Sequence, residues 1–158
     1  MKNLNFSIGI LSWKGYASLY KSLKSYEENG LNSLTQSKFI CLPEYNNEGL
    51  IICKNFGYKP ILFKKNIGIL NGFKNLALNM PDGPLLLLEN DLSLVANNKM
   101  THTLLKQSLE HLYKYKAAQV RLRSIKDPGK PFHAINKYKK YWGCGTIKKI
   151  KRLFRPNK

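Results

Sequence analysis

Short apolar runs alternate with longer amphipathic stretches over the first ninety residues of the chain. The short runs are rich in aliphatic residues, as strands are, and the stretches between them repeat apolar residues at helical spacing. The predicted strands are residues 5–13, 38–42, 59–63 and 85–88, and the predicted helices are residues 16–28, 47–55 and 76–80. This alternation of strand and helix predicts an α/β domain with a Rossmann-like, mainly parallel sheet.

Four consecutive leucines at residues 85–88 follow the turn at residues 81–84. A continuous apolar run of this length predicts an inner strand that is buried on both faces. Glu89 and Asp91 follow directly, at the carboxyl end of that strand, which is the end where open α/β sheets bind ligands. An acid-x-acid pair there can hold a hard divalent cation. The alternative is an ordinary strand end with solvated carboxylates.

The character of the chain changes after residue 92. Residues 100–118 predict a helix, with a buried face that is expected to hold Leu105, Leu109, Leu112 and Tyr113. Residues 119–124 then alternate apolar and basic side chains, as in a half-buried strand. Arg121 and Arg123 share one face of this segment. Their guanidinium groups can clamp phosphates in a bidentate manner, or they can form a solvated strand face.

The charge is strongly and unevenly positive. The chain has 27 lysines and arginines against 9 acidic residues, a net charge of +18. Residues 1–92 carry 10 basic and 7 acidic residues, whereas residues 93–158 carry 17 basic and 2 acidic residues. A basic half of this kind implies an anionic partner, which is nucleic acid, a phosphate-rich small molecule or an anionic membrane surface.

Cysteine usage and the absence of targeting signals predict a cytoplasmic protein. The three cysteines, Cys41, Cys53 and Cys144, form no C-x-x-C pair and are odd in number, so we expect free thiols rather than a disulfide framework or a zinc site. The N-terminus has no signal-peptide pattern, and no apolar run reaches the length of a membrane span. Peripheral contact with a membrane stays open.

Four motifs of the first half occur in an order that is informative when they are taken together. They are Ile10–Trp13, Pro43–Glu44, Asn66–Gly68 with Gly72–Asn75, and Leu88–Asp91. In this order they resemble the nucleotide-binding half of a GT-A-type glycosyltransferase of the large family-two kind. The resemblance covers residues 5–95 well. Beyond that half it is loose, although residues 120–124 and 127–129 are similar to stretches in small members of the group.

The length of 158 residues predicts a single domain over residues 1–158. Within it, the resemblance implies a nucleotide-sugar-binding half at 1–95 and a short basic acceptor-side region at 96–158. It also implies a nucleotide-diphosphate sugar at the carboxyl edge of the sheet. Carried over to this sequence, Ser12 borders the base and Glu44 contacts the base or the ribose. Asn66 and Gly68 lie in a turn near the nucleotide.

The same resemblance assigns the acid pair to a metal. Glu89 would face the ribose or a metal-bound water, and Asp91 would ligate Mg²⁺ or Mn²⁺ that bridges the diphosphate. The chain departs from the family pattern at Glu89, where Asp is common. Arg121 and Arg123 are candidates for the diphosphate or for an acceptor phosphate. The implied activity is transfer of a sugar to a hydroxyl group of a glycan or a lipid-linked acceptor.

Two other functions remain open. One is a truncated or inactive transferase fold that binds nucleotide only, because few residues follow the acid pair. The other is a basic nucleic-acid-binding protein, which the modest charge of residues 1–92 and the lack of a known nucleic-acid-binding signature disfavour. Residues 148–155 combine cationic and apolar side chains, which favours contact with an anionic membrane surface or simply a solvated tail.

Asp127 is the candidate general base for transfer. The alternative is a purely structural role, because Asp127 opens an Asp-Pro-Gly turn. Only Glu110 and Asp127 are acidic after residue 92, and Glu110 lies among leucines in a predicted helix. We predict that Asp127→Asn keeps donor binding but slows transfer by about 10²- to 10⁴-fold, the usual loss for a general base. Glu110→Gln is the matched control and should transfer at the parental rate. Transfer by the Asp127 variant at the parental rate would remove Asp127 from the mechanism.

Overall fold

The computed structural model of the chain describes residues 4–120 and 122. The chain divides into two units, residues 1–118 and residues 119–158. Nearly all described residues belong to the first unit, and the fold below is that of this unit. The predicted site residues Arg121, Arg123 and Asp127 lie outside the described residues.

The described chain forms an α/β fold with one parallel sheet and four α-helices in a Rossmann-like topology. The order of the strands across the sheet is β3-β2-β1-β4, and every pairing is parallel. The predicted fold class is therefore confirmed at this level. The elements are β1 (Ser7–Leu11), α1 (Tyr16–Glu28), the 3₁₀-helix η1 (Leu31–Ser33), β2 (Lys38–Pro43), α2 (Asn47–Asn55), β3 (Lys59–Phe63), α3 (Gly68–Asn79), β4 (Leu85–Glu89) and α4 (Asn98–Lys114).

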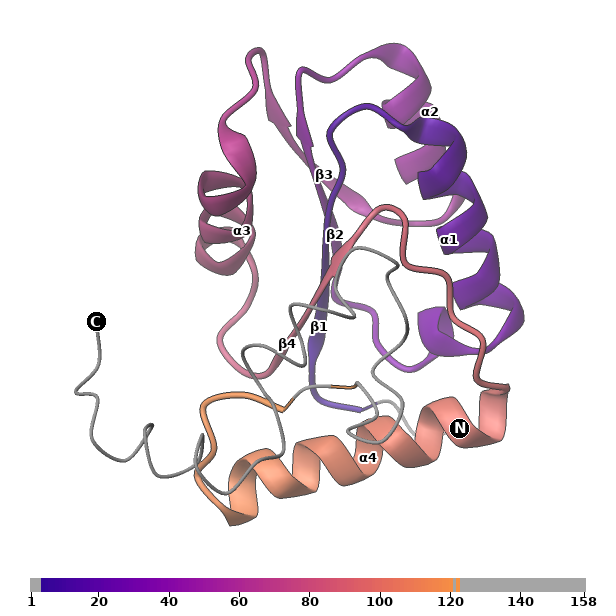
Figure 1. Cartoon of the computed structure of the whole chain (residues 1–158), viewed down its shortest axis with the longest axis vertical. Helices are drawn as coiled ribbons and strands as arrows, with labels where there is room; N and C mark the ends of the chain where they lie inside the picture. Colours follow the sequence, from indigo (N-terminus) through magenta and orange to yellow (C-terminus); the bar gives the residue numbers. More distant parts are fainter. Residues whose placement is uncertain (1–3, 121, 123–158) are drawn as a thin grey trace, which may run out of the picture. The chain divides into compact units, whose positions relative to one another are not determined.

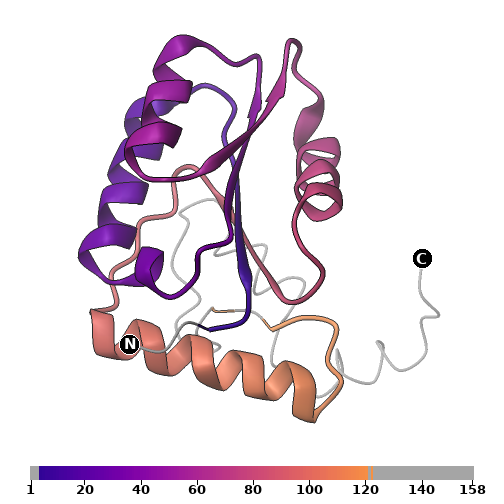
Figure 2. The ribbon, with the colours of Figure 1, turned by 180° about the vertical axis from the view of Figure 1, so that it is seen from behind.

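The helices form a layer on each side of the sheet. Helices α1 and α2 cover one face and α3 covers the other, as Figures 1 and 2 show from opposite sides. Helix α4 crosses near the amino ends of the strands, at the bottom of Figure 1. Because all strands run in the same direction, their carboxyl ends meet at one edge, at the top of Figure 1.

The larger part of the core lies between the sheet and helices α1 and α2. Ile8 and Ile10 of β1 are fully buried there, against Leu19 and Leu23 of α1. The two isoleucines are two residues apart and the two leucines four apart, so each pair lies on one face of its element. Burial of these aliphatic side chains supplies most of the driving force that holds the layers together.

A smaller core lies between the sheet and α3, where Leu76 and Met80 pack with Leu11 and Cys41. Gly72 permits this close approach. A Cβ atom at residue 72 would lie 2.5 Å from the Cδ1 atom of Leu11. The glycine therefore has a packing function in the middle of α3, in addition to any influence on the turn before the helix.

The prediction of an inner leucine strand is wrong for the described sheet. Strand β4 pairs with β1 alone among the described strands, so it is an edge strand. The side chain of Leu87 is 41% exposed. β1 is instead the strand that is buried along its whole length. A run of leucines signals an apolar environment, but pairing between distant segments decides which strand is central.

Two helices differ from their predicted bounds. Helix α3 begins at Gly68, well before residue 76. Helix α4 spans Asn98–Lys114, and the side-chain oxygen of Asn97 accepts a hydrogen bond from the Met100 amide at its start. Leu105 is buried as expected, but Tyr113 is 63% exposed. Within residues 4–120, no helix has both the length and the apolar character that a membrane span requires.

Cys41 and Cys53 are buried free thiols, as the sequence predicts for these two residues. Burial raises the pKa of each thiol to about 11. Because the thiolate is the nucleophilic form, neither cysteine has the environment of a reactive residue. Cys144 lies outside the described residues.

Helix α3 offers a matched test of this packing. Leu76 is fully buried and Leu78 is 71% exposed, only two positions apart. We predict that Leu76→Ala lowers the free energy of unfolding by about 2–5 kcal/mol because it leaves a cavity. Leu78→Ala should change it by less than about 0.5 kcal/mol. Urea denaturation measures both. Equal losses in the two variants would contradict the placement of α3 on the sheet.

Candidate functional site

The predicted site lies where the order of the strands changes direction. The chain proceeds from β1 to β2 to β3 on one side and then places β4 on the other side of β1. Leu11 is paired with Glu89 in the register, so the loops that leave β1 and β4 start side by side. The side-chain amide of Asn90 links them by donating to the Gly15 carbonyl over 3.3 Å. In open α/β sheets, this position outside the carboxyl ends is the usual place for a ligand.

Glu89 and Asp91 are both exposed at this edge. Glu89 is the last residue of β4, and Asp91 lies in the turn that follows. Within the described part of the chain, neither carboxylate takes part in a salt bridge or in a side-chain hydrogen bond. These two acids therefore present their charge to solvent, where a cation can reach them.

A third acid, Glu44, is held at the end of the neighbouring strand β2. The indole N–H of Trp13 donates to Oε2 of Glu44 over 2.7 Å, and Nζ of Lys14 lies 3.4 Å from the same oxygen. The indole hydrogen bond, followed by the contact with Lys14, lowers the pKa of Glu44 below its ordinary value. These contacts join the loop after β1 to the end of β2 and keep the carboxylate ionised.

The backbone supports this cluster at a conformational cost. Lys14 and Glu44 have φ angles of 56° and 51°, in the left-handed region that non-glycine residues rarely adopt. Strain of this kind is found at functional sites more often than elsewhere. Trp13, in the loop after β1, is half-exposed. Its ring is therefore accessible at the same edge as the acids.

Ser12 is fully buried at the end of β1. Its hydroxyl donates to the Lys14 carbonyl over 3.3 Å, and its amide donates to the Cys41 carbonyl over 3.0 Å. The side chain therefore shapes the loop that carries Trp13 and Lys14. A direct contact between Ser12 and a ligand stays a prediction.

The turn before α3 lies at the end of β3, on the same edge. Oδ1 of Asn66 accepts a hydrogen bond of 2.8 Å from the Gly68 amide, which organises the first turn of the helix. Gly68 has a φ angle of 74° and open space where a Cβ atom would be. Lys64 and Lys65 precede this turn and are exposed. The turn thus combines two cations with an open approach to the backbone, which suits an anionic ligand.

The structure brings six of the predicted site residues to one edge of the sheet. They are Ser12, Glu44, Asn66, Gly68, Glu89 and Asp91. The sequence interpretation missed the roles of Trp13 and Lys14 around Glu44 and of Asn90 beside Gly15. The contacts of Trp13 and Lys14 with Glu44 could not be found from the sequence, because nothing in the local sequence indicates that residues 13 and 14 meet residue 44.

The described residues of the candidate site fit Mg²⁺ or Mn²⁺ better than a structural zinc ion. They contain no group of three or more His, Cys, Asp or Glu side chains that would hold a metal alone. Glu89 and Asp91 supply two carboxylates, which does not suit a structural zinc site. Mg²⁺ and, by analogy, Mn²⁺ prefer oxygen ligands, and Mg²⁺ usually keeps waters and shares its coordination between one or two carboxylates and substrate phosphates. The acid pair therefore fits a cation that is bound together with a phosphorylated substrate.

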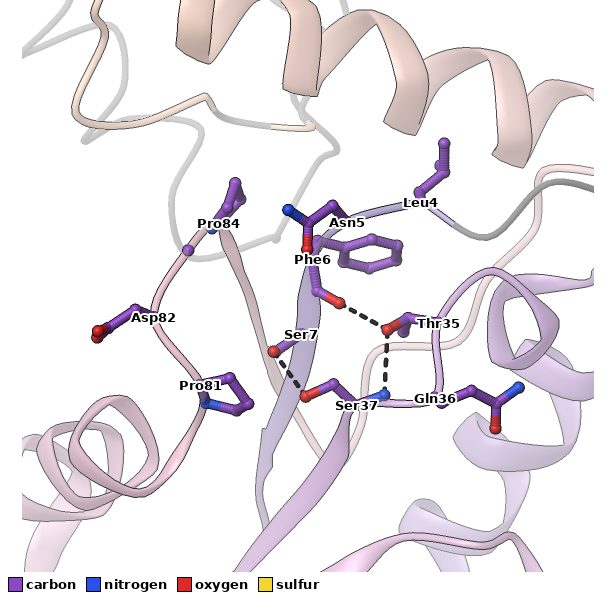
Figure 3. A pocket seen from close by; sticks show the side chains of 11 residues that line it. Leu4, Asn5, Phe6, Ser7, Thr35, Gln36, Ser37, Pro81, Asp82 and Pro84 are labelled. Carbon is purple, nitrogen blue, oxygen red and sulfur yellow. Dashed lines mark hydrogen bonds between the residues drawn. The ribbon is translucent and has the colours of Figure 1, made fainter.

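A small pocket of about 200 Å³ lies at the opposite edge, beside the amino ends of the strands (Figure 3). The hydroxyls of Ser7 and Ser37 bond to each other over 2.7 Å. The Thr35 hydroxyl donates to the Phe6 carbonyl and accepts from the Ser37 amide. Each of these hydroxyls thus has a hydrogen-bond partner within the fold, and none of the predicted site residues lines the pocket. It is therefore not the candidate site.

Comparisons with models of known protein families, with curated proteins and with solved structures gave no match. The class that the fold defines is an α/β protein with a Rossmann-like parallel sheet. The likeness to GT-A glycosyltransferases stays an interpretation of the motifs and of their place at one edge of the sheet.

The indole of Trp13 provides a test of the cluster. We predict that Trp13→Phe raises the pKa of Glu44 toward its ordinary value, because the variant loses the N–H donor that contributes most to lowering it. A ¹³C NMR titration of the carboxyl group measures this pKa. Tyr45→Phe, which changes the next residue in the sequence and removes a hydroxyl that does not contribute to the shift, is the control and should leave the pKa of Glu44 unchanged. A parental titration curve in the Trp13 variant would contradict the proposed contact.

Proposed function

We propose that this protein is a GT-A-type glycosyltransferase, which binds a nucleotide-diphosphate sugar with Mg²⁺ or Mn²⁺ and transfers the sugar to an acceptor hydroxyl. The observation that carries the proposal is the position of Glu89 and Asp91. They stand exposed and free of ion pairs, as far as the structure describes the chain, at the carboxyl end of β4 beside the loop that leaves β1. Parallel sheets bind nucleotides at such a place.

The surrounding residues suggest how the donor would lie. Asp91, with Glu89, would hold the cation against the diphosphate. Glu44 is kept ionised by Trp13 and Lys14 and would accept hydrogen bonds from ribose or base hydroxyl and amino groups. Asn66 and Gly68 would border the nucleotide from the turn before α3. The exposed positive charges of Lys64 and Lys65 favour an anionic donor at this edge.

The proposed reaction is a displacement at the anomeric carbon of the donor sugar. The oxygen of the acceptor hydroxyl forms a bond to this carbon as the bond from the carbon to the β-phosphate oxygen breaks. The nucleoside diphosphate leaves with the electron pair, and the acceptor proton passes to a base, for which Asp127 is the candidate. A divalent cation held by Asp91 and Glu89 would neutralise the charge that develops on the leaving phosphate.

The basic C-terminal half extends the proposal to the acceptor. Residues 93–158 carry 17 basic and 2 acidic residues. This excess favours an anionic acceptor, such as a lipid-linked phosphate, or peripheral contact with an anionic membrane. Arg121 and Arg123 would contribute to this contact or to the diphosphate.

The metal role of the acid pair is tested by Asp91→Asn. The substitution removes a charge at an exposed position, so we predict loss of Mn²⁺-dependent donor binding with little change in stability. The matched control is Asp82→Asn, in the exposed turn before β4 at the opposite edge. It should bind like the parent.

The measurement is the melting temperature with and without Mn²⁺ in a panel of uridine, guanosine and adenosine diphosphates and their sugars. A bound donor raises it by mass action. Equal Mn²⁺-dependent shifts in the parent and in the Asp91 variant would refute the metal role. A shift with nucleotides but no sugar transfer would favour an inactive, nucleotide-binding fold. Salt-sensitive binding to nucleic acid without any nucleotide shift would favour the nucleic-acid alternative.

A further inference from the structure

Helix α1 holds the segment that carries Asp91. After β4, residues 90–94 run alongside α1 toward α4, as both ribbon views show (Figures 1 and 2). Four polar side chains, three from α1 and one from Asn29, which caps its C-terminus, contact the backbone of this 90–94 segment. They are Ser22, Ser25, Tyr26 and Asn29, spaced at positions i, i+3, i+4 and i+7 and hence on one face of the helix.

The hydrogen bonds fall on every second residue of the segment, Asn90, Leu92 and Leu94. The Ser22 hydroxyl donates to the Asn90 carbonyl over 3.0 Å, and the Tyr26 hydroxyl donates to the Leu92 carbonyl. At the far end, the backbone amide of Leu94 donates to the Ser25 hydroxyl over 2.8 Å, and the side-chain amide of Asn29 donates to the Leu94 carbonyl over 3.0 Å. Asp91 therefore lies between two carbonyl groups that α1 holds in place.

Tyr26 is the central member of this set. Its side chain is only 2% exposed, and its ring belongs to the main core. Burial raises the pKa of its hydroxyl to about 12, and the negative charge of Asp91 adds to the shift. The hydroxyl therefore stays protonated and remains a donor across the physiological pH range. A rigid, buried group thus fixes the backbone next to an exposed carboxylate.

We infer that Tyr26 and Ser22 are positioning residues, which aim the Asp91 carboxylate at a divalent cation by holding the carbonyl groups on either side of it. This inference rests on the proposed function. A carboxylate on an unrestrained loop would have to be ordered whenever the cation binds, whereas this loop is ordered in advance by α1. Removal of a group that orients a metal ligand without binding the metal itself typically weakens metal binding by about 10- to 100-fold.

Tyr26→Phe deletes the hydroxyl and keeps the buried ring. Tyr58→Phe is a matched control, because Tyr58 is also a buried tyrosine and its hydroxyl donates to Asn32 over 2.7 Å rather than to the 90–94 segment. The probe is Mn²⁺, whose free form is counted by EPR, first alone and then with uridine, guanosine or adenosine diphosphate. We expect Mn²⁺ affinity to fall about 10- to 100-fold in Tyr26→Phe and to stay at the parental value in Tyr58→Phe.

Each outcome distinguishes the inference from the function on which it rests. Parental affinity in Tyr26→Phe, or an equal loss in both tyrosine variants, would overturn the positioning role while leaving the proposed function intact. No Mn²⁺ binding by the parent would refute the proposed function and the inference with it.

If Tyr26→Phe does not fold, Ser22→Ala carries the test. Its control is Ser108→Ala, which removes a hydroxyl that donates to a carbonyl within α4 over 2.7 Å. Weaker Mn²⁺ binding in Ser22→Ala alone would support the positioning role, and equal affinities in the two serine variants would overturn it.

Discussion

The parallel pairing of β1 with β2 and β4 is the constraint on which the rest of the structure depends. A parallel pair cannot be closed by a tight turn, so each connection must cross from one end of the sheet to the other. The crossings place α1 and α2 on one face and α3 on the other, and they bury β1 along its whole length. They also bring the carboxyl end of every described strand to one edge of the sheet. Residues from four segments that are far apart in the sequence therefore meet there.

The candidate site is built on this edge by two kinds of support. The loop after β1 and the end of β2 are joined through Glu44, which contacts the indole of Trp13 and the ammonium of Lys14 although Lys14 and Glu44 have left-handed backbone angles. The loop after β4 is held differently, by hydroxyl and amide groups of α1 that bind its backbone. One support fixes a charge directly, whereas the other fixes the chain on either side of a charge and leaves the carboxylate itself exposed.

Sequence patterns determined the elements and their type. Strand and helix alternation predicted the α/β class, and the bounds of α1, α2 and β3 agree with those expected from apolar spacing and from turn residues. The motifs also predicted which residues would meet at the carboxyl edge, because a parallel sheet fixes where each loop must emerge. The Asn-x-Gly turn at residues 66–68 marks the start of α3, whereas the apolar pattern of its first turn does not, because Ile69 and Leu70 are exposed.

Features that depend on contacts between residues far apart in the chain were decided only by the tertiary structure. Four leucines predict burial, but the pairing of β4 with β1 alone among the described strands makes it an edge strand. Trp13 is half-exposed because Glu44, thirty-one residues away, accepts its N–H. Nothing in the local sequence marks the polar residues of α1 as contacts of the loop after β4, and this role depends on residues 90–94 lying against them. Local sequence encodes the conformation of a segment, whereas its hydrogen-bond partners are set by how the segments pack.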